Sequence, residues 1–316
     1  MMQPRLSTIF RLIRLPNLIV IALTLSAVRY LVILPGLAGL SISPGISPVA
    51  FGLIVFTTLT IAAAGYILND CYDIETDMIN RPERRVIGKD ISRKSGLLVA
   101  VVLFTIALLM GLTVSVLIRS ALPFLVFLIA VIVAWWYAIM LKRTFLLGNL
   151  AVACMTACTI GMIWLFDWLA AGSEILKGSD TRFITIIVTA TMVFAWQLNL
   201  MREIVKDMED VKGDERLMCR SLPIVLGMQA SKNMLAWQAI LTISLLLASQ
   251  AWLCMNKFYF VSVWLLLSVE LPLAWFVFRI GRTTSGKGFH RLSSMIRWIM
   301  LGGLLSLLVL RLNAAL

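Results

Sequence analysis

Long apolar stretches alternate with short polar connections along almost the whole chain. Each stretch is close to twenty residues long and shows no period-two alternation of apolar and polar positions, so it indicates a helix rather than a strand. Because the bilayer core offers no water to the backbone, a spanning segment must be a helix or part of a closed barrel. We therefore predict an all-α, polytopic membrane protein with about nine spans, near residues 16–34, 49–68, 97–117, 121–140, 147–170, 183–201, 233–254, 258–278 and 292–312.

Composition agrees with this pattern. Of the 316 residues, 60% are hydrophobic and only 14% are charged, which lies outside the range of soluble domains. Residues 1–15 mix Arg5, Arg11 and Arg14 with apolar side chains, a pattern typical of an amphipathic helix that lies in the membrane interface. We treat residues 1–316 as one transmembrane domain that begins with this interfacial helix.

The formal net charge of +12 does not indicate nucleic-acid binding. The basic residues gather in short connections beside the spans, where they set topology and meet anionic lipid headgroups. Counted over alternate connections, most of the 28 Lys and Arg residues fall on one side. The positive-inside rule makes that side cytoplasmic, so we expect the N-terminus and the connections 69–95 and 202–222 to face the cytoplasm from the cell (inner) membrane.

Two acidic stretches stand out among these connections. Asp70, Asp73 and Asp77 follow the second apolar run, and three more aspartates with the same i, i+3, i+7 spacing follow the sixth, namely Asp207, Asp210 and Asp214. On a helix that advances about 100° per residue, this spacing brings the three side chains within roughly 60° of one another. Like charges so arranged repel unless cations lie between them, and loop parity places both stretches at one membrane surface. We expect the two faces to converge on one metal-rich site.

The chemistry of such a site follows from what the chain lacks. Its five cysteines form no CxxC pair and its single histidine is His290, so a zinc site or a Ser/His/Asp triad is not indicated. Carboxylate oxygens suit Mg²⁺, which commonly takes one or two carboxylates together with substrate phosphates. With a basic surround and apolar helical walls, the ligand that fits is a long-chain prenyl diphosphate bound through Mg²⁺.

At this point the residues carry a resemblance. Asn69-Asp70-Cys71-Tyr72-Asp73 followed by Asp77 is similar to the NDxxDxxxD motif of the UbiA superfamily of intramembrane prenyltransferases. Asn80-Arg81-Pro82 resembles that family's NRP segment, Tyr137 to Lys142 its YxxxLK segment, and Asp207 to Asp214 its second motif, DxxDxxxD. The likeness runs from about Arg14 to the last span.

The resemblance implies a nine-helix bundle around a central cavity, Mg²⁺ dependence, and transfer of a prenyl group from its diphosphate to an acceptor. It implies that the metal ligands are Asn69, Asp70, Asp73, Asp77, Asp207, Asp210 and Asp214. It implies that the diphosphate is bound by Lys142, Arg202, Lys206 and Arg81 or Arg85, that Tyr137 also binds substrate, and that catalysis depends above all on Asp70, Asp73, Asp207, Asp210 and Lys142. We add Asn17 as a substrate-binding candidate, because a polar amide within a span faces a cavity or bonds to a neighbouring helix.

The acceptor is harder to infer. Residues 202–214 look most like the subgroup that geranylgeranylates geranylgeranylglycerol phosphate during ether-lipid synthesis, and an aromatic acceptor of quinone biosynthesis is the alternative. A cation-coupled transporter is the rival class, but it would place its carboxylates near the bilayer midplane. We expect a prenyl diphosphate, a lipid or aromatic acceptor and membrane lipids as partners, and no nucleic acid. The sequence carries no signal for an oligomeric state.

Overall fold

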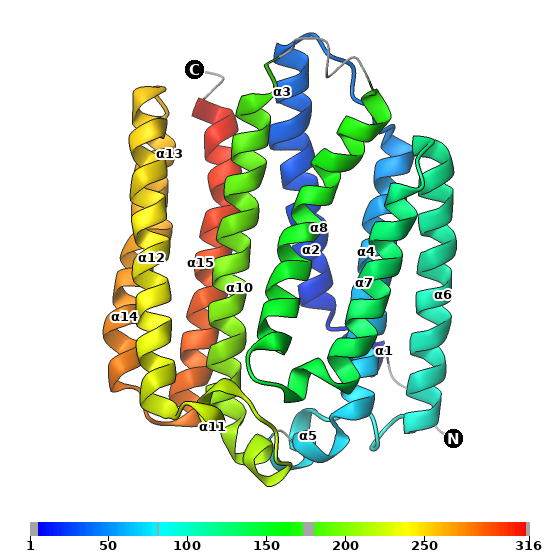
Figure 1. Cartoon of the computed structure of the whole chain (residues 1–316), viewed down its shortest axis with the longest axis vertical. Helices are drawn as coiled ribbons and strands as arrows, with labels where there is room; N and C mark the ends of the chain where they lie inside the picture. Colours follow the sequence, from blue (N-terminus) through cyan, green and yellow to red (C-terminus); the bar gives the residue numbers. More distant parts are fainter. Residues whose placement is uncertain (1–5, 81, 173–179, 314–316) are drawn as a thin grey trace. The chain divides into compact units, whose positions relative to one another are not determined.

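The fold is almost entirely helical. A computed structural model describes residues 6–80, 82–172 and 180–313 (Figure 1). Within these residues nine helices are long and apolar enough to cross a membrane, which confirms the predicted number. They are Leu15–Gly39, Pro48–Tyr72, Arg93–Ile118, Leu122–Ile139, Leu147–Ala171, Arg182–Arg216, Met228–Met255, Tyr259–Arg282 and Gly286–Asn313.

Two of these spans contain a π-helical segment, which the sequence pattern does not indicate. The first consists of α2 (Leu15–Ala27), the π-helix η1 (Val28–Ile33) and α3 (Leu34–Gly39). The eighth consists of α13 (Tyr259–Leu265), the π-helix η4 (Leu266–Glu270) and α14 (Leu271–Arg282). A π-helical segment changes neither the length nor the mean hydropathy of an apolar run much, so hydropathy alone cannot reveal it.

The chain divides into two compact units. Unit 1 contains α4 (Pro48–Tyr72), which packs against α6 (Arg93–Ile118) and α7 (Leu122–Ile139). Figure 1 shows these three helices side by side. The buried rings of Phe127 and Phe166 meet edge to face in its core, with centroids 6.0 Å apart. The unit also contains α1 (Leu6–Leu12), most of α2, α5 (Ile74–Asn80), the 3₁₀ turn η2 (Pro82–Arg84) and the second part of α8 (Leu147–Ala171).

Unit 1 holds the start of α6 close to the end of α4. A Cβ atom at Gly96, in the first turn of α6, would lie 2.6 Å from Cys71 Sγ and 2.9 Å from the side chain of Ile87. Only a glycine permits this approach, which fixes the connection between the two helices against the first acidic stretch. Ser92 caps α6, because its hydroxyl accepts a hydrogen bond from the Ser95 amide at 3.1 Å.

Unit 2 is formed mainly by the C-terminal helices. It contains the first part of α8 and the long helix α10 (Arg182–Arg216), followed by α11 (Leu222–Val225), α12 (Met228–Met255), α13, η4, α14 and α15 (Gly286–Asn313). A Cβ atom at Gly303 of α15 would collide with the ring of Phe194 on α10. The Phe194 ring therefore packs directly against the backbone of α15. Trp264 Nε1 donates to the carbonyl of Gly302 at 2.9 Å and joins α13 to α15. Small residues at such crossings are what membrane helix packing requires.

Large apolar side chains cover the outside of the helices. Trp298 is 72% exposed and Trp237 is 70% exposed, and many exposed Leu, Ile and Val side chains accompany them. In water such a surface would aggregate, whereas lipid chains solvate it. The protein is therefore an integral membrane protein.

Candidate active site

The spacing of the first acidic stretch led us to expect one uninterrupted helix. The structure instead shows a break in it. Helix α4 ends at Tyr72, and Asp73 leaves the helical conformation with φ −99° and ψ 7° before α5 begins at Ile74. Backbone hydrogen bonds of the helical i to i−4 type still span the break. The Asp73 amide donates to the Asn69 carbonyl (3.0 Å), and the Asp77 amide donates to the Asp73 carbonyl (2.8 Å). The three aspartates thus remain near one another across a bend.

Asp70 is paired with a residue that we predicted only as part of the interfacial helix. Arg14 donates from Nη2 to Asp70 Oδ1 at 2.7 Å, and its guanidinium also lies over the ring of Tyr66, 4.9 Å from the centroid. The Asp70 side chain is 18% exposed. Arg14, between α1 and α2, therefore belongs to the site and does not serve only as a contact for lipid headgroups.

Asp73 is the most enclosed carboxylate of this stretch, with its side chain 10% exposed. It forms an ion pair with Lys142, which stands in the 3₁₀ turn η3 (Leu141–Arg143). Asn69 Nδ2 also donates to Asp73 Oδ2 at 2.5 Å. The other end of that amide, Asn69 Oδ1, is buried without a hydrogen-bond partner among the described residues, so an oxygen ligand beside Asp73 remains unused.

The surroundings shift the ionisation of two groups near this stretch. Burial, followed by the neighbouring carboxylates of Asp73 and Asp70, raises the pKa of Asp77 to about 6. For Lys142, burial alone would lower the pKa of the ammonium, but the adjacent carboxylate of Asp73 outweighs it and the pKa lies above the ordinary value. Lys142 therefore stays a cation at neutral pH, while Asp77 changes charge near pH 6.

The remaining predicted residues of unit 1 are placed as follows. Arg85 is half-buried, and its Nε is buried without a partner among the described residues. Tyr137 is half-buried near the end of α7, and Asn17 is half-buried in the first turn of α2. Arg81 lies outside the described residues. The structure thus brings Lys142 into contact with the aspartates and leaves the roles of the other residues as predictions.

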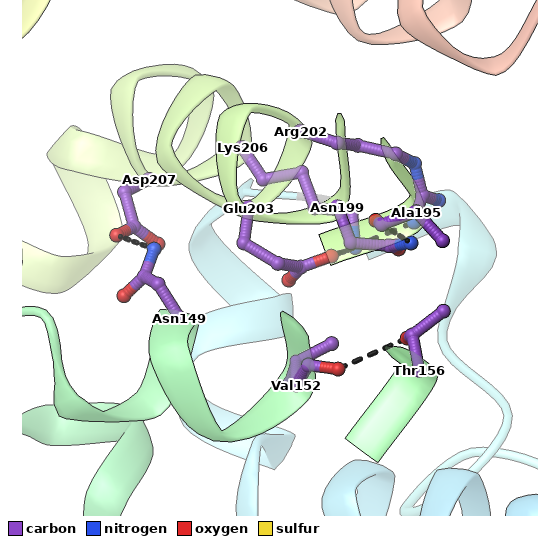
Figure 2. A network of polar contacts seen from close by, with 9 residues as sticks. All are labelled: Asn149, Val152, Thr156, Ala195, Asn199, Arg202, Glu203, Lys206 and Asp207. Carbon is purple, nitrogen blue, oxygen red and sulfur yellow. Dashed lines mark hydrogen bonds and ion pairs between the residues drawn. The ribbon is translucent and has the colours of Figure 1, made fainter. Parts of the chain in front are cut away.

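The second acidic stretch lies in unit 2 and does form one continuous helix. Asp207, Asp210 and Asp214 all fall within the 35 residues of α10, as the spacing predicts. Asn149, 8% exposed in the first turn of α8, donates from Nδ2 to Asp207 Oδ2 at 2.8 Å (Figure 2). Arg220, just after α10, donates its amide to the carbonyl of Arg143, which precedes α8, at 3.0 Å.

One turn before Asp207, α10 carries a carboxylate between two cations. Lys206 Nζ lies 2.5 Å from Glu203 Oε1, and Arg202 Nη1 lies 3.5 Å from the same oxygen. Figure 2 shows the three side chains extending from adjacent positions of α10 near Asn199, whose amide donates to the Ala195 carbonyl at 2.9 Å. Arg202 and Lys206 were predicted diphosphate ligands, whereas Glu203 was not among the predicted site residues.

Three residues in contact with the two acidic stretches or their cations were not predicted from the sequence, namely Arg14, Asn149 and Glu203. Asn149 carried a usable signal, since a polar amide in the first turn of an apolar span needs a partner. Arg14 looked like one more interfacial cation, and Glu203 like one more charge beside a membrane. Their roles depend on which residue lies opposite, which spacing along the chain does not give.

The donor set fits a hard divalent cation. Among the described side chains no group of three His, Cys, Asp or Glu residues is arranged to hold an ion alone. Mg²⁺ does not require such a cage, because it commonly binds one or two carboxylates and completes its shell with water and substrate phosphates. The unused Asn69 Oδ1 next to Asp73 is an oxygen donor of the kind that Mg²⁺ accepts.

An all-helical membrane protein with two aspartate stretches, each beside amide and cationic side chains, has the architecture of an intramembrane prenyltransferase. The chain belongs to the UbiA prenyltransferase family, whose family model matches residues 32–300. It is similar to the digeranylgeranylglyceryl phosphate synthase of Thermococcus gammatolerans, with 32% identity over 246 residues that cover 78% of this chain and 80% of the relative. The resemblance seen in the motifs, and the prediction of a prenyltransferase, are both confirmed.

Two solved structures share the fold. One is described for digeranylgeranylglyceryl phosphate synthase in membranes; it matches with a TM-score of 0.60 and 22% identity over 97% of this chain and 98% of the other. The second is a UbiA homolog from Archaeoglobus fulgidus bound to DMAPP and Mg2+, with a TM-score of 0.57 and 15% identity over 93% of this chain and 98% of the homolog. The predicted UbiA-like fold is therefore confirmed.

Proposed function

We propose that this prenyltransferase transfers a geranylgeranyl group from its diphosphate to geranylgeranylglycerol phosphate in a reaction that depends on Mg²⁺. The acceptor is supported by the 32% identity to a digeranylgeranylglyceryl phosphate synthase over most of both chains. The metal is supported by the oxygen donors of the site and by the homolog bound to DMAPP and Mg2+. The observation that carries the proposal is the enclosed Asp73 in contact with Asn69 and Lys142.

The residue roles follow from this chemistry. Asn69, Asp70, Asp73 and Asp77 form one set of metal ligands in the proposal, and Asp207, Asp210 and Asp214 form the other. A bound Mg²⁺ would neutralise negative charge on the diphosphate and so make it a better leaving group. The chain itself supplies fixed cations for the same purpose, with the predicted ligands Arg81, Arg85, Lys142, Arg202 and Lys206, while Tyr137 and Asn17 are proposed to contact the substrate.

The two unpaired guanidinium nitrogens support the diphosphate-binding role. Arg85 Nε and Arg202 Nε are buried without partners among the described residues, a state that costs free energy until an acceptor arrives. In the reaction the bond between the prenyl carbon and the diphosphate oxygen breaks, and negative charge grows on that oxygen. Positioned donors stabilise this charge as it develops, after which the acceptor oxygen bonds to the prenyl carbon and loses its proton.

The membrane orientation is part of the proposal. We propose that the single prenyltransferase domain lies in the cell (inner) membrane, with residues 1–15 in the interface and the active-site connections 69–95 and 202–222 on the cytoplasmic side. The excess of Lys and Arg in the N-terminal segment and in alternate connections supports this orientation through the positive-inside rule.

The direct test uses purified protein in lipid nanodiscs with radiolabelled geranylgeranyl diphosphate and Mg²⁺. Geranylgeranylglycerol phosphate is compared with hydroxybenzoate and dihydroxynaphthoate acceptors. We expect EDTA-sensitive product with the glycerol phosphate lipid. Product only with an aromatic acceptor would replace the acceptor in the proposal, and no EDTA-sensitive turnover with any acceptor would overturn it.

Substitutions then test the metal ligands. Asp73→Ala and Asp207→Ala should each reduce transfer by at least about a hundredfold, because each removes a proposed ligand of a catalytic ion. Asp90→Ala is the matched control, since Asp90 lies in the same connection as the first motif but is exposed and only weakly paired with Arg11 at 4.0 Å. Near-normal transfer by either of the first two variants would contradict the assignment.

A further inference from the structure

Glu203 is a buried carboxylate that the proposed chemistry does not use. Its side chain is 12% exposed, and one of its oxygens lies near both Lys206 Nζ (2.5 Å) and Arg202 Nη1 (3.5 Å). Figure 2 shows this group on the helix surface that also carries Asp207, whose carboxylate contacts Asn149 instead. Glu203 is therefore directed to the cations and not to the aspartate.

The helix geometry explains why one carboxylate reaches both cations. Glu203 and Lys206 are three residues apart and lie on the same face of α10, and Arg202 is the immediate neighbour. The contact with Lys206 is short, whereas that with Arg202 is at the limit of a hydrogen bond. Arg202 also keeps a buried Nε without a partner in the described part of the chain, so its donors are only partly used.

We propose that Glu203 competes with the diphosphate for Arg202 and Lys206. It holds the two cations in position while no diphosphate is bound, and after the reaction it takes them back and so hastens release of the product diphosphate. This inference rests on the proposed function, in which Arg202 and Lys206 bind the diphosphate. Glu203 is a positioning residue in this account, because it acts through the two cations and touches no reacting atom.

The competition follows from electrostatics. Two cations in a largely enclosed place are costly without a counter-charge, and a diphosphate and Glu203 can each supply one. When both anions are present they repel each other, and this repulsion is strong because few water molecules lie between them. Removal of the Glu203 charge therefore strengthens diphosphate binding, which is the opposite of what the loss of a merely structural contact would do.

The test measures binding of magnesium pyrophosphate to the full-length protein in nanodiscs by isothermal titration calorimetry, with steady-state kinetics alongside. Glu203→Gln keeps the size of the side chain and removes its charge. We expect it to bind pyrophosphate at least tenfold more tightly than wild type and to show a lower kcat with a lower KM for the prenyl diphosphate. Glu203→Asp keeps the charge and should stay within about threefold of wild type in pyrophosphate affinity.

Two further variants complete the design. Glu215→Gln removes the same charge from an exposed position of α10 and should leave pyrophosphate affinity unchanged. Lys206→Gln should weaken pyrophosphate binding, and the double variant with Glu203→Gln should return the affinity toward that of wild type, because the two charge changes compensate. In Glu203→Gln the charge of Lys206 has lost its partner, and this could impair folding. The double variant removes both charges, so its comparison with Lys206→Gln still tests the proposal in that case.

Unchanged or weaker pyrophosphate binding by a folded Glu203→Gln protein would overturn the inference. The binding arm needs neither acceptor nor turnover, so it is readable even if the transfer assay fails. Loss of pyrophosphate binding by wild type itself would count against the proposed function, whereas normal binding that Glu203→Gln does not strengthen would count only against the role of Glu203.

Discussion

At the scale of single residues, the structure balances negative charge with side chains of the same chain. Asp70 faces Arg14 and Asp73 faces Lys142, so two acids of the first stretch already have a cation. Such pairing is expected where carboxylates are withdrawn from water, because an unpaired buried charge would be far more costly than a paired one. Metal binding at this stretch therefore adds to an existing charge network and does not start from bare acids.

Asn149 offers a test of the second stretch. Asn149→Ala removes the amide that donates to Asp207 Oδ2 and leaves that carboxylate without its orienting hydrogen bond. Loss of such a supporting contact typically lowers metal affinity about 10–100-fold. We expect the Mg²⁺ concentration for half-maximal transfer to rise by a factor in this range, as measured by titrating Mg²⁺ in the transfer assay.

The control for this variant is Asn233→Ala, at an exposed position of α12, which should leave the Mg²⁺ titration unchanged. An Asn149→Ala enzyme with a wild-type Mg²⁺ requirement would show that Asp207 needs no orientation by this amide.

Asp77 predicts a pH dependence. Its pKa is raised to about 6 by burial and by the carboxylates of Asp73 and Asp70, so without metal the folded protein binds more protons than the unfolded chain between about pH 4 and 6. Stability contributed by this group therefore rises as the pH falls through 6. Mg²⁺ needs the ionised form, so its affinity falls over the same range. We expect Mg²⁺ to raise the thermal unfolding midpoint more at pH 7.5 than at pH 5.5.

Asp77→Asn cannot ionise at this position and should flatten the pH dependence of the Mg²⁺-induced stabilisation near pH 6. An equal pH dependence in the variant and in wild type would assign the effect to another group.

At the scale of helices, two acidic stretches with identical spacing adopt different backbones. Asp207 to Asp214 lie on the continuous helix α10, whereas the helix that carries Asp70 ends at Tyr72 and resumes at Ile74. Neither stretch has a proline, and only the second contains a glycine, Gly213. The presence of glycine or proline therefore does not predict the break at Asp73.

Helix packing supplies a stability test in unit 2. Gly303→Ala would drive a methyl group into the ring of Phe194, because α10 and α15 approach too closely for a side chain. Overpacking of this kind costs about 1–3 kcal/mol, so we expect the thermal unfolding midpoint in detergent to fall by several degrees. Gly281→Ala is the matched control, since no atom lies within 4 Å of a Cβ at that helical position. Equal midpoints for the two variants would contradict the close contact of α10 with α15.

At the scale of the whole molecule, hydropathy predicted the all-helical class and the number of spans, the motif resemblance supplied the UbiA-like fold, and most side-chain pairs were not predictable. Nine apolar runs give nine spans because each must satisfy its own backbone in lipid, a constraint that is local and therefore visible in sequence. The partners of Asp70, Asp207 and Lys206 lie 56, 58 and 3 residues away, and the two distant ones, Arg14 and Asn149, were missed as partners. Lys142, 69 residues from Asp73, was found through the motif resemblance and not through physical reasoning.

The number of spans leads to a topology test. Single cysteines at Lys89 and Lys212, in a chain whose five native cysteines are replaced, should react with a membrane-impermeant maleimide only from the cytoplasmic side. A cysteine at Ser43, in the connection between α3 and α4, should react only from the opposite side. Labelling of Lys89→Cys and Lys212→Cys from opposite faces would disprove the proposed orientation.

The length of α10 has a further consequence. Its 35 residues correspond to about 52 Å at 1.5 Å per residue, whereas the hydrocarbon layer is about 30 Å thick. Because α10 is one continuous helix, an adjustment of its tilt to a thinner or thicker bilayer would move the end that carries Asp207 and Asp214 relative to the headgroup layer. We therefore expect the activity of this enzyme to depend on membrane thickness as well as on ionic strength and pH.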